Sequence, residues 1–157
     1  MVQVVHLSDL AKVEESRRVD LKAVIESMPA ARHLGIKVIG FLESGVSRVE
    51  LVIEPHHTFD GKVVQAGVVG ALADYAGVSA AAATLGEGWM ASTTGFEVHN
   101  LAPAFGERLI AVGHALLVKA SHAVSRVDVY AQREGQLEVS LVGYATTSCR
   151  PVQLPTK

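Results

Sequence analysis

One segment of the sequence constrains the fold more than any other: residues 66–85 read AGVVGALADYAGVSAAAATL. Placed at helical spacing, the segment is apolar on every side, and its alanine content favours a helix over a strand. A helix of this kind has to be covered on most of its surface. The rest of the chain is therefore expected to wrap around it.

The sequence on both sides of this helix alternates apolar and polar residues with the period of two that is typical of strands. A short helix is expected from Asp20 to Met28, ended or offset by Pro29, with Gly35 as terminator. Residues 1–19 are charged and are expected to form a solvated arm or short helix, and the tail from Pro151 to be irregular. The expected strands are 36–43, 46–54, 90–101, 107–119, 123–133 and 137–149.

Consecutive strands with short connections form antiparallel sheets. The pattern predicts an α+β fold in which a six-stranded antiparallel sheet curls around the long helix, its concave side filled by that helix. No linker or repeat divides the 157 residues, so a single domain is expected over 1–157.

Composition excludes several classes of function. Sixteen acidic and fourteen basic residues give a net charge of −2, which offers no basic surface for nucleic acid or for a membrane. The one cysteine, Cys149, and seven histidines without ligand spacing provide no disulfide framework and no metal motif. The first residues show no signal-peptide pattern, so a cytoplasmic protein is expected.

Asp74 is the only charged residue between Lys62 and Glu87. A carboxylate on a buried helix has to be paired, hydrogen-bonded or shifted in pKa. Small residues share its side of the helix and are expected to leave a groove for a thin ligand or another backbone; they are Gly67, Gly70, Gly77 and Ala81. Asp74 is therefore either a base or nucleophile, or a packing residue that binds backbone groups or a partner subunit.

The stretch from His57 to Gly77 resembles the signature of the hotdog-fold acyl-CoA thioesterases of the PaaI-like, 4-hydroxybenzoyl-CoA thioesterase group. Gln65-Ala66-Gly67 takes the place of the family's His-Gly-Gly motif, nine residues before the carboxylate at Asp74. The stretch Thr93–Ala104 resembles the following strand and its Pro-Ala turn, and Gly106-Glu107 resembles the start of the next strand. The resemblance covers about residues 30–150 and implies a hotdog fold.

The resemblance also implies a site. Asp74 would act as general base or nucleophile on a thioester. The backbone N–H groups of Ala66 and Gly67 would hold the thioester oxygen, and Thr93 would help to position water. Gln65 completes the expected catalytic set. Substrate-binding residues are expected at Thr58, Asp60, Gly61, Gly70 and Thr94. The substrate would be an acyl-CoA, with no cofactor or metal, and the sites would lie across the interface of a homodimer or homotetramer.

The sequence departs from the family pattern at this motif. Gln65 replaces a histidine and cannot become cationic, Ala66 replaces a glycine, and one extra residue lies between Gly61 and Gln65. The acyl group, small or medium, aromatic or aliphatic, is left open. The alternatives are a non-catalytic acyl-thioester binding protein and a hotdog hydratase, although the latter needs a catalytic histidine where Val64 and Gln65 stand.

Overall fold

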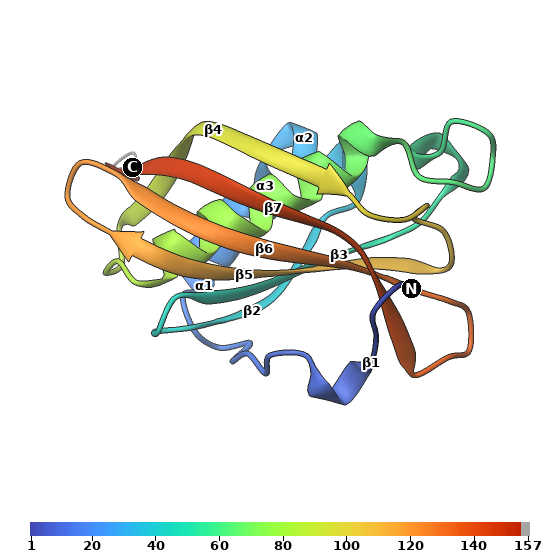
Figure 1. The fold of residues 1–157 in the computed structure, drawn as a ribbon. Helices are drawn as coiled ribbons and strands as arrows, with labels where there is room; N and C mark the ends of the chain where they lie inside the picture. The colour runs from blue at the N-terminus through green and yellow to red at the C-terminus, as the bar shows by residue number, and fades with distance from the viewer. Residues whose placement is uncertain (155–157) are drawn as a thin grey trace.

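The computed structural model, which describes residues 1–154, has a long helix, α3 (Ala66–Ala83), in the concave side of a curled sheet (Figure 1). Neighbouring strands are antiparallel and follow the order β4-β7-β6-β5-β3-β2. The strands are β2 (Lys37–Leu42), β3 (Val46–Val52), β4 (Trp89–Asn100), β5 (Arg108–Val118), β6 (Ala123–Gln132) and β7 (Glu138–Gln153). The predicted fold class, a six-stranded antiparallel sheet around a central helix, is confirmed.

Small residues let α3 approach the sheet closely. A Cβ atom at Gly77 would overlap Thr147 of β7, and one at Gly113 of β5 would overlap the carbonyl of Ala76. Ala81 is fully buried as well. A groove for a thin ligand or another backbone was expected beside Gly77 and Ala81; the protein's own sheet fills that space at Gly77, where Thr147 lies against the helix, and Ala81 is buried. Length and composition alone would let α3 span a membrane, but most of it is buried in the fold.

The first nineteen residues are more ordered than the sequence indicated. A short strand, β1 (Val4–His6), pairs with the start of β7, and a 3₁₀ turn, η1 (Leu7–Asp9), follows it. Leu10 is buried against Ile110 and Val139 on the outer face of the sheet. The segment expected to be a solvated arm therefore packs across the outer face of the sheet, because its apolar residues cover apolar residues of β5 and β7 there.

β7 also continues beyond its expected end, through Pro151 to Gln153. The last pair between β6 and β7 joins Ala123 to Cys149, whereas β4 pairs with β7 as far as Gln153. Within residues 1–154, β7 therefore has a strand neighbour on one side only beyond Cys149, and proline is tolerated in such an edge position. The prediction of an irregular tail from Pro151 is wrong for residues 151–153, and residues 155–157 lie outside the described part of the chain.

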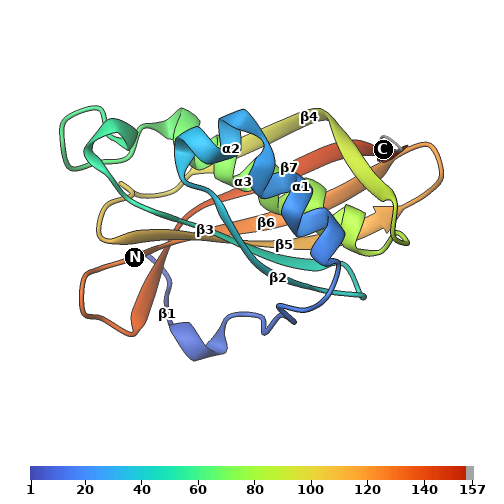
Figure 2. The ribbon, with the colours of Figure 1, turned by 180° about the vertical axis from the view of Figure 1, so that it is seen from behind.

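Two short helices lie on the side of α3 that faces away from the sheet (Figure 2). They are α1 (Val19–Ser27) and α2 (Pro29–Leu34), and Pro29 separates them as the first residue of α2. Leu21 and Ile25, one turn apart on α1, are both buried. Helix α1, together with α3 and β4, encloses the space in which the candidate site lies. A second 3₁₀ turn, η2 (Pro55–His57), begins the loop that leads into α3.

Candidate active site

Asp74 lies in the middle of α3 and is half-buried. The hydroxyl of Thr93 on β4 lies 3.0 and 3.2 Å from the two carboxylate oxygens and donates to them. Burial raises the pKa of Asp74, and the hydrogen bond from Thr93 offsets part of this rise. A carboxylate with a raised pKa and no cationic partner among residues 1–154 is a better proton acceptor than an ordinary aspartate.

An apolar cavity of about 250 Å³ opens beside this pair. It runs between α1, α3 and β4, and Asp74 and Thr93 lie in its wall. The apolar side chains that line it are Leu21, Ile25, Met28, Val78, Ala82, Met90 and Ala91. Among residues 1–154, Asp74 contributes the one charged side chain to this lining, so the cavity suits an uncharged, apolar group.

Cys149 lies close enough to Asp74 to interact with it electrostatically, but it is fully buried. Burial, with a smaller contribution from the negative charge of Asp74, raises the pKa of this thiol to about 11. The thiol is therefore protonated at neutral pH and is a poor nucleophile.

The start of α3 presents a different chemistry. Gln65 is the N-cap residue, and its side-chain oxygen accepts a hydrogen bond from the N–H of Gly67. The N–H of Ala66, the first residue of the helix, meets no acceptor within residues 1–154. Both residues are exposed. Of the two backbone donors expected here, that of Gly67 is occupied by Gln65, which leaves the N–H of Ala66 free to bind an oxygen.

Ala66 and Asp74 lie eight residues apart on one helix, which corresponds to about 12 Å along its axis. A single carbonyl group cannot contact both. Within one chain, the structure therefore brings Asp74 and Thr93 together but keeps them apart from Gln65, Ala66 and Gly67. Any reaction that needs both groups requires a second copy of the chain.

Three of the expected substrate-binding residues, Thr58, Asp60 and Gly61, lie in the loop before α3 and take part in hydrogen bonds within that loop. The hydroxyl of Thr58 accepts from the N–H of Gly61, and Asp60 accepts from the N–H groups of Lys62 and Val63. The hydrogen bond from Val63, above all, lowers the pKa of Asp60. Gly61 has a φ of 85°, which favours glycine. This loop is attached to the start of α3, not to the cavity beside Asp74.

The remaining two expected residues differ in their surroundings. Gly70 is buried, and a Cβ atom there would contact Phe96 and Val98 of β4 at ordinary distances. Thr94 follows Thr93 on β4 and is exposed. Gly70 therefore packs against β4, and Thr94 lies on the surface beside the candidate site.

Sequence analysis missed the residues of α1 that line the cavity, Leu21 and Ile25, and the Met28 that follows them. Their helical spacing was visible, but a helical pattern does not tell which element the apolar side will cover. It also missed Arg18, whose guanidinium contacts the far end of α3 across more than sixty residues of sequence.

No protein-family model matches the sequence, and a search of curated proteins found no similar one. Solved structures do match the fold. A thioesterase family protein from Silicibacter pomeroyi superposes with a TM-score of 0.75 at 23% identity, over 84% of this chain and 95% of that one. A thioesterase from Haemophilus influenzae gives 0.71 at 20%, over 85% and 89%.

The PaaI protein of the phenylacetic acid degradation operon of E. coli gives a TM-score of 0.67 at 18% identity, over 86% of this chain and 91% of that one. Sequence identities this low establish the fold and not the reaction. The fold that the resemblance implied is confirmed: this chain has the hotdog fold of the PaaI-like thioesterases.

Proposed function

We propose that the protein hydrolyses an acyl-CoA thioester whose acyl group is apolar and of small or medium size. The observation that carries the proposal is the position of Asp74, a carboxylate with a raised pKa in the wall of an apolar cavity. The thioesterases among the fold neighbours favour the same reaction class. The two flexible methionines of the cavity, Met28 and Met90, can adapt to an aromatic or an aliphatic group.

The reaction proceeds by attack on the thioester carbonyl. Asp74, oriented by the hydroxyl of Thr93, takes a proton from water as the water oxygen bonds to the carbonyl carbon, or attacks that carbon itself. Negative charge then develops on the carbonyl oxygen, where the N–H of Ala66 and the positive end of the α3 dipole stabilise it. Cleavage of the carbon–sulfur bond releases CoA as the thiolate, which on the first route takes up the proton that Asp74 removed from water. On the second route, water hydrolyses the mixed anhydride left on Asp74, which releases the free acid, restores the carboxylate and supplies the proton that the thiolate takes up.

This arrangement requires two copies of the chain, because Ala66 and Asp74 are too far apart within one. Among the described residues, β4 pairs with β7 on one side and with no strand on the other, which leaves a twelve-residue edge open. Open edges of this length favour pairing with another chain. Phe96 on this strand and Leu101 just after it are exposed. We therefore infer a homodimer built across the β4 edges, with two sites at its interface.

Thiol release from a panel of acyl-CoAs tests the proposal. Wild-type protein is expected to release CoA from at least one of acetyl-, hexanoyl-, octanoyl- and phenylacetyl-CoA. Asp74→Asn is expected to reduce kcat by about 10²–10⁴-fold, as for the loss of an essential base. Asp128→Asn, which removes a carboxylate ion-paired with Arg126 on β6, is the matched control and should keep normal activity.

Two results would contradict the proposal. Normal kcat in Asp74→Asn would remove the carboxylate from the mechanism. Tight binding of acyl-CoA by the wild type without any thiol release would instead identify a non-catalytic acyl-thioester binding protein of the same fold.

A further inference from the structure

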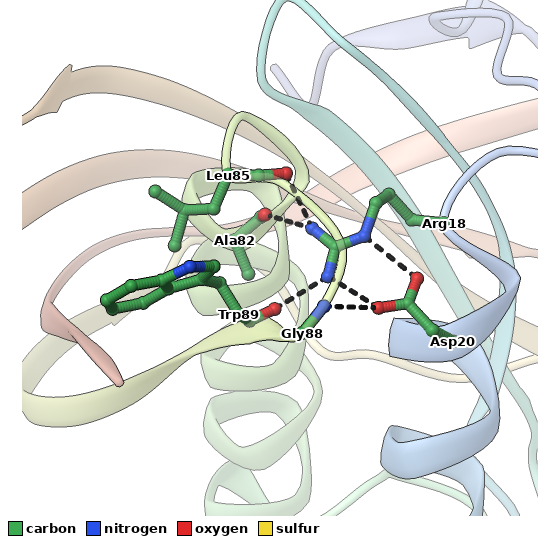
Figure 3. A network of polar contacts seen from close by, with 6 residues as sticks. All are labelled: Arg18, Asp20, Ala82, Leu85, Gly88 and Trp89. Atoms are coloured by element: carbon green, nitrogen blue, oxygen red, sulfur yellow. Dashed lines mark hydrogen bonds and ion pairs between the residues drawn. The ribbon is translucent and has the colours of Figure 1, made fainter. Parts of the chain in front are cut away.

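A single arginine joins three separate elements near the C-terminal end of α3 (Figure 3). Arg18 immediately precedes α1, and its side chain is almost completely buried. One guanidinium nitrogen donates to the carbonyls of Ala82 and Leu85, both at 2.8 Å, and another donates to that of Trp89 at 2.6 Å. The same guanidinium binds the two carboxylate oxygens of Asp20 at 2.9 and 3.0 Å.

The physical reason lies at the end of α3. The last carbonyls of a helix have no partner within it, and the helix dipole places negative charge there. A guanidinium has five N–H donors in a fixed plane and can satisfy several carbonyls at once. Arg18 also holds a φ of 48°, a left-handed conformation that is costly for a residue other than glycine. The contacts of its side chain offset that cost.

Each element that Arg18 joins also contributes a wall of the cavity. Arg18 lies three residues before Leu21 on α1, its contact Ala82 lines the cavity from α3, and Trp89 directly precedes Met90 on β4. Ala82 lies eight residues beyond Asp74, about 12 Å along the helix axis. The guanidinium therefore fixes the cavity at the end opposite to the reacting groups.

We propose that Arg18 is a positioning residue that sets the depth of the acyl cavity and, through it, the preference of the protein for acyl length. The inference rests on the proposed function, since it assigns the cavity to the acyl group. A short acyl group stays beside Asp74 and Thr93 and never reaches the walls that Arg18 holds. A longer one packs against Leu21, Ala82 and Met90 and depends on their spacing.

Arg18→Met removes the hydrogen bonds but keeps an apolar stem of similar length. For octanoyl-CoA, KM is expected to rise about tenfold, the equivalent of losing the burial of about two methylene groups. For acetyl-CoA, kcat and KM are expected to stay near the wild-type values. Arg18→Lys keeps the charge without the planar fork and should lie in between. Arg17→Met is the matched control, because Arg17 binds the exposed Glu43 and touches no wall of the cavity.

Binding of octanoate separates failure of this inference from failure of the proposed reaction. Isothermal titration calorimetry measures this binding directly, without a reporter group in the cavity. Octanoate is expected to bind the wild type and to bind about tenfold more weakly to Arg18→Met. This measurement holds even if no acyl-CoA is hydrolysed.

The kinetic and binding results each decide the question. An equal fall in kcat/KM for acetyl-CoA and octanoyl-CoA in both Arg18 variants would show that Arg18 supports the fold without setting the preference for acyl length. Unchanged KM for octanoyl-CoA, or octanoate that binds wild type and Arg18→Met equally or binds neither, would also overturn the inference. Melting curves of Arg18→Lys and Arg18→Met identify any loss that merely follows unfolding.

Discussion

The two ends of α3 are built in opposite ways. At the start, the helix is exposed, its cap comes from the adjacent Gln65, and the N–H of Ala66 has no acceptor among residues 1–154. At the end, the carbonyls of Ala82 and Leu85 are bound by Arg18, which comes from a distant part of the chain. One end is left open to an outside oxygen, whereas the other is closed by the protein itself.

This difference between the two helix ends suggests that the start of α3 takes part in binding, whereas its end stabilises the fold. A free N–H at a helix start can bind a negative oxygen without first breaking another contact, and it costs little while exposed to water. Buried carbonyls at a helix end would be costly if left unpaired, so the fold supplies a cation for them. Changes at the open end should therefore act on activity, and changes at the closed end on stability and on the shape of the cavity.

The largest expected effect is at the open end. Ala66→Pro removes the backbone N–H but suits the first position of a helix, and Gln65, with φ −65° and ψ 136°, already has the conformation preferred before proline. Thioester hydrolysis is expected to fall about 10²–10³-fold, as for the loss of one oxyanion donor, with a near-normal melting temperature. Ala66→Gly keeps the N–H and serves as the control. Full activity in Ala66→Pro would show that the thioester oxygen is not bound by the N–H of Ala66.

The opposite result is expected at the closed end. Arg18→Ala removes the guanidinium from the carbonyls of Ala82, Leu85 and Trp89, of which that of Ala82 keeps the N–H of Leu85, and should lower the free energy of unfolding by about 1–3 kcal/mol. Chemical denaturation of wild type and variant at neutral pH measures this loss. A variant as stable as the wild type would mean that water replaces the guanidinium without cost, and the contrast between the two ends would disappear.

Asp74 allows a test of stability against pH. Burial raises the pKa of Asp74 in the folded protein above the 3.8 of an unperturbed aspartate, so ionisation is easier in the unfolded chain. Below 3.8 the group is protonated in both states and costs nothing; as pH rises through the folded pKa, the stability penalty becomes complete. Asp74→Asn should therefore melt at a higher temperature than the wild type at neutral pH, and the gain should vanish towards pH ~3. A destabilised Asp74→Asn at neutral pH would contradict the burial of an ionised carboxylate.

The smallest effect is expected at Gln65. Its side-chain oxygen caps the helix through Gly67, so Gln65→Ala should cost up to about 1 kcal/mol of stability, the usual value for a lost cap. Hydrolysis should fall far less than in Asp74→Asn or Ala66→Pro, because the N–H of Ala66 is kept. Kinetics and melting of the purified variant measure both quantities. A loss of activity as large as that of Asp74→Asn would show that the Gln65 amide itself contacts the substrate.

The features that depend on neighbouring residues could be predicted from the sequence. The apolar segment 66–85, the period-two strands and the isolation of Asp74 can all be read from neighbouring residues, and the structure has each of them. The structure adds a capping role for Gln65, whose side-chain oxygen accepts from the N–H of Gly67.

What the sequence did not predict depends on contacts between distant residues. Arg18 reaches its carbonyl partners on α3 and β4 over 64 to 71 positions, and no local pattern marks such a pairing. Gly77 was assigned to the side of Asp74, but a helix wheel does not tell which side the sheet will cover, and Thr147 lies against it. The continuation of β7 past Pro151 depends on β4 as its neighbour.

The central claim is that a complete site combines Asp74 of one chain with Ala66 of another. Asp74→Asn and Ala66→Pro, each nearly inactive alone, can be mixed under conditions that exchange subunits. In a mixed dimer, one of the two sites then has both an intact Asp74 and an intact Ala66 N–H. Thioesterase activity well above that of either variant alone is expected. No recovery of activity, in a mixture whose subunit exchange is verified by mass, would contradict the claim.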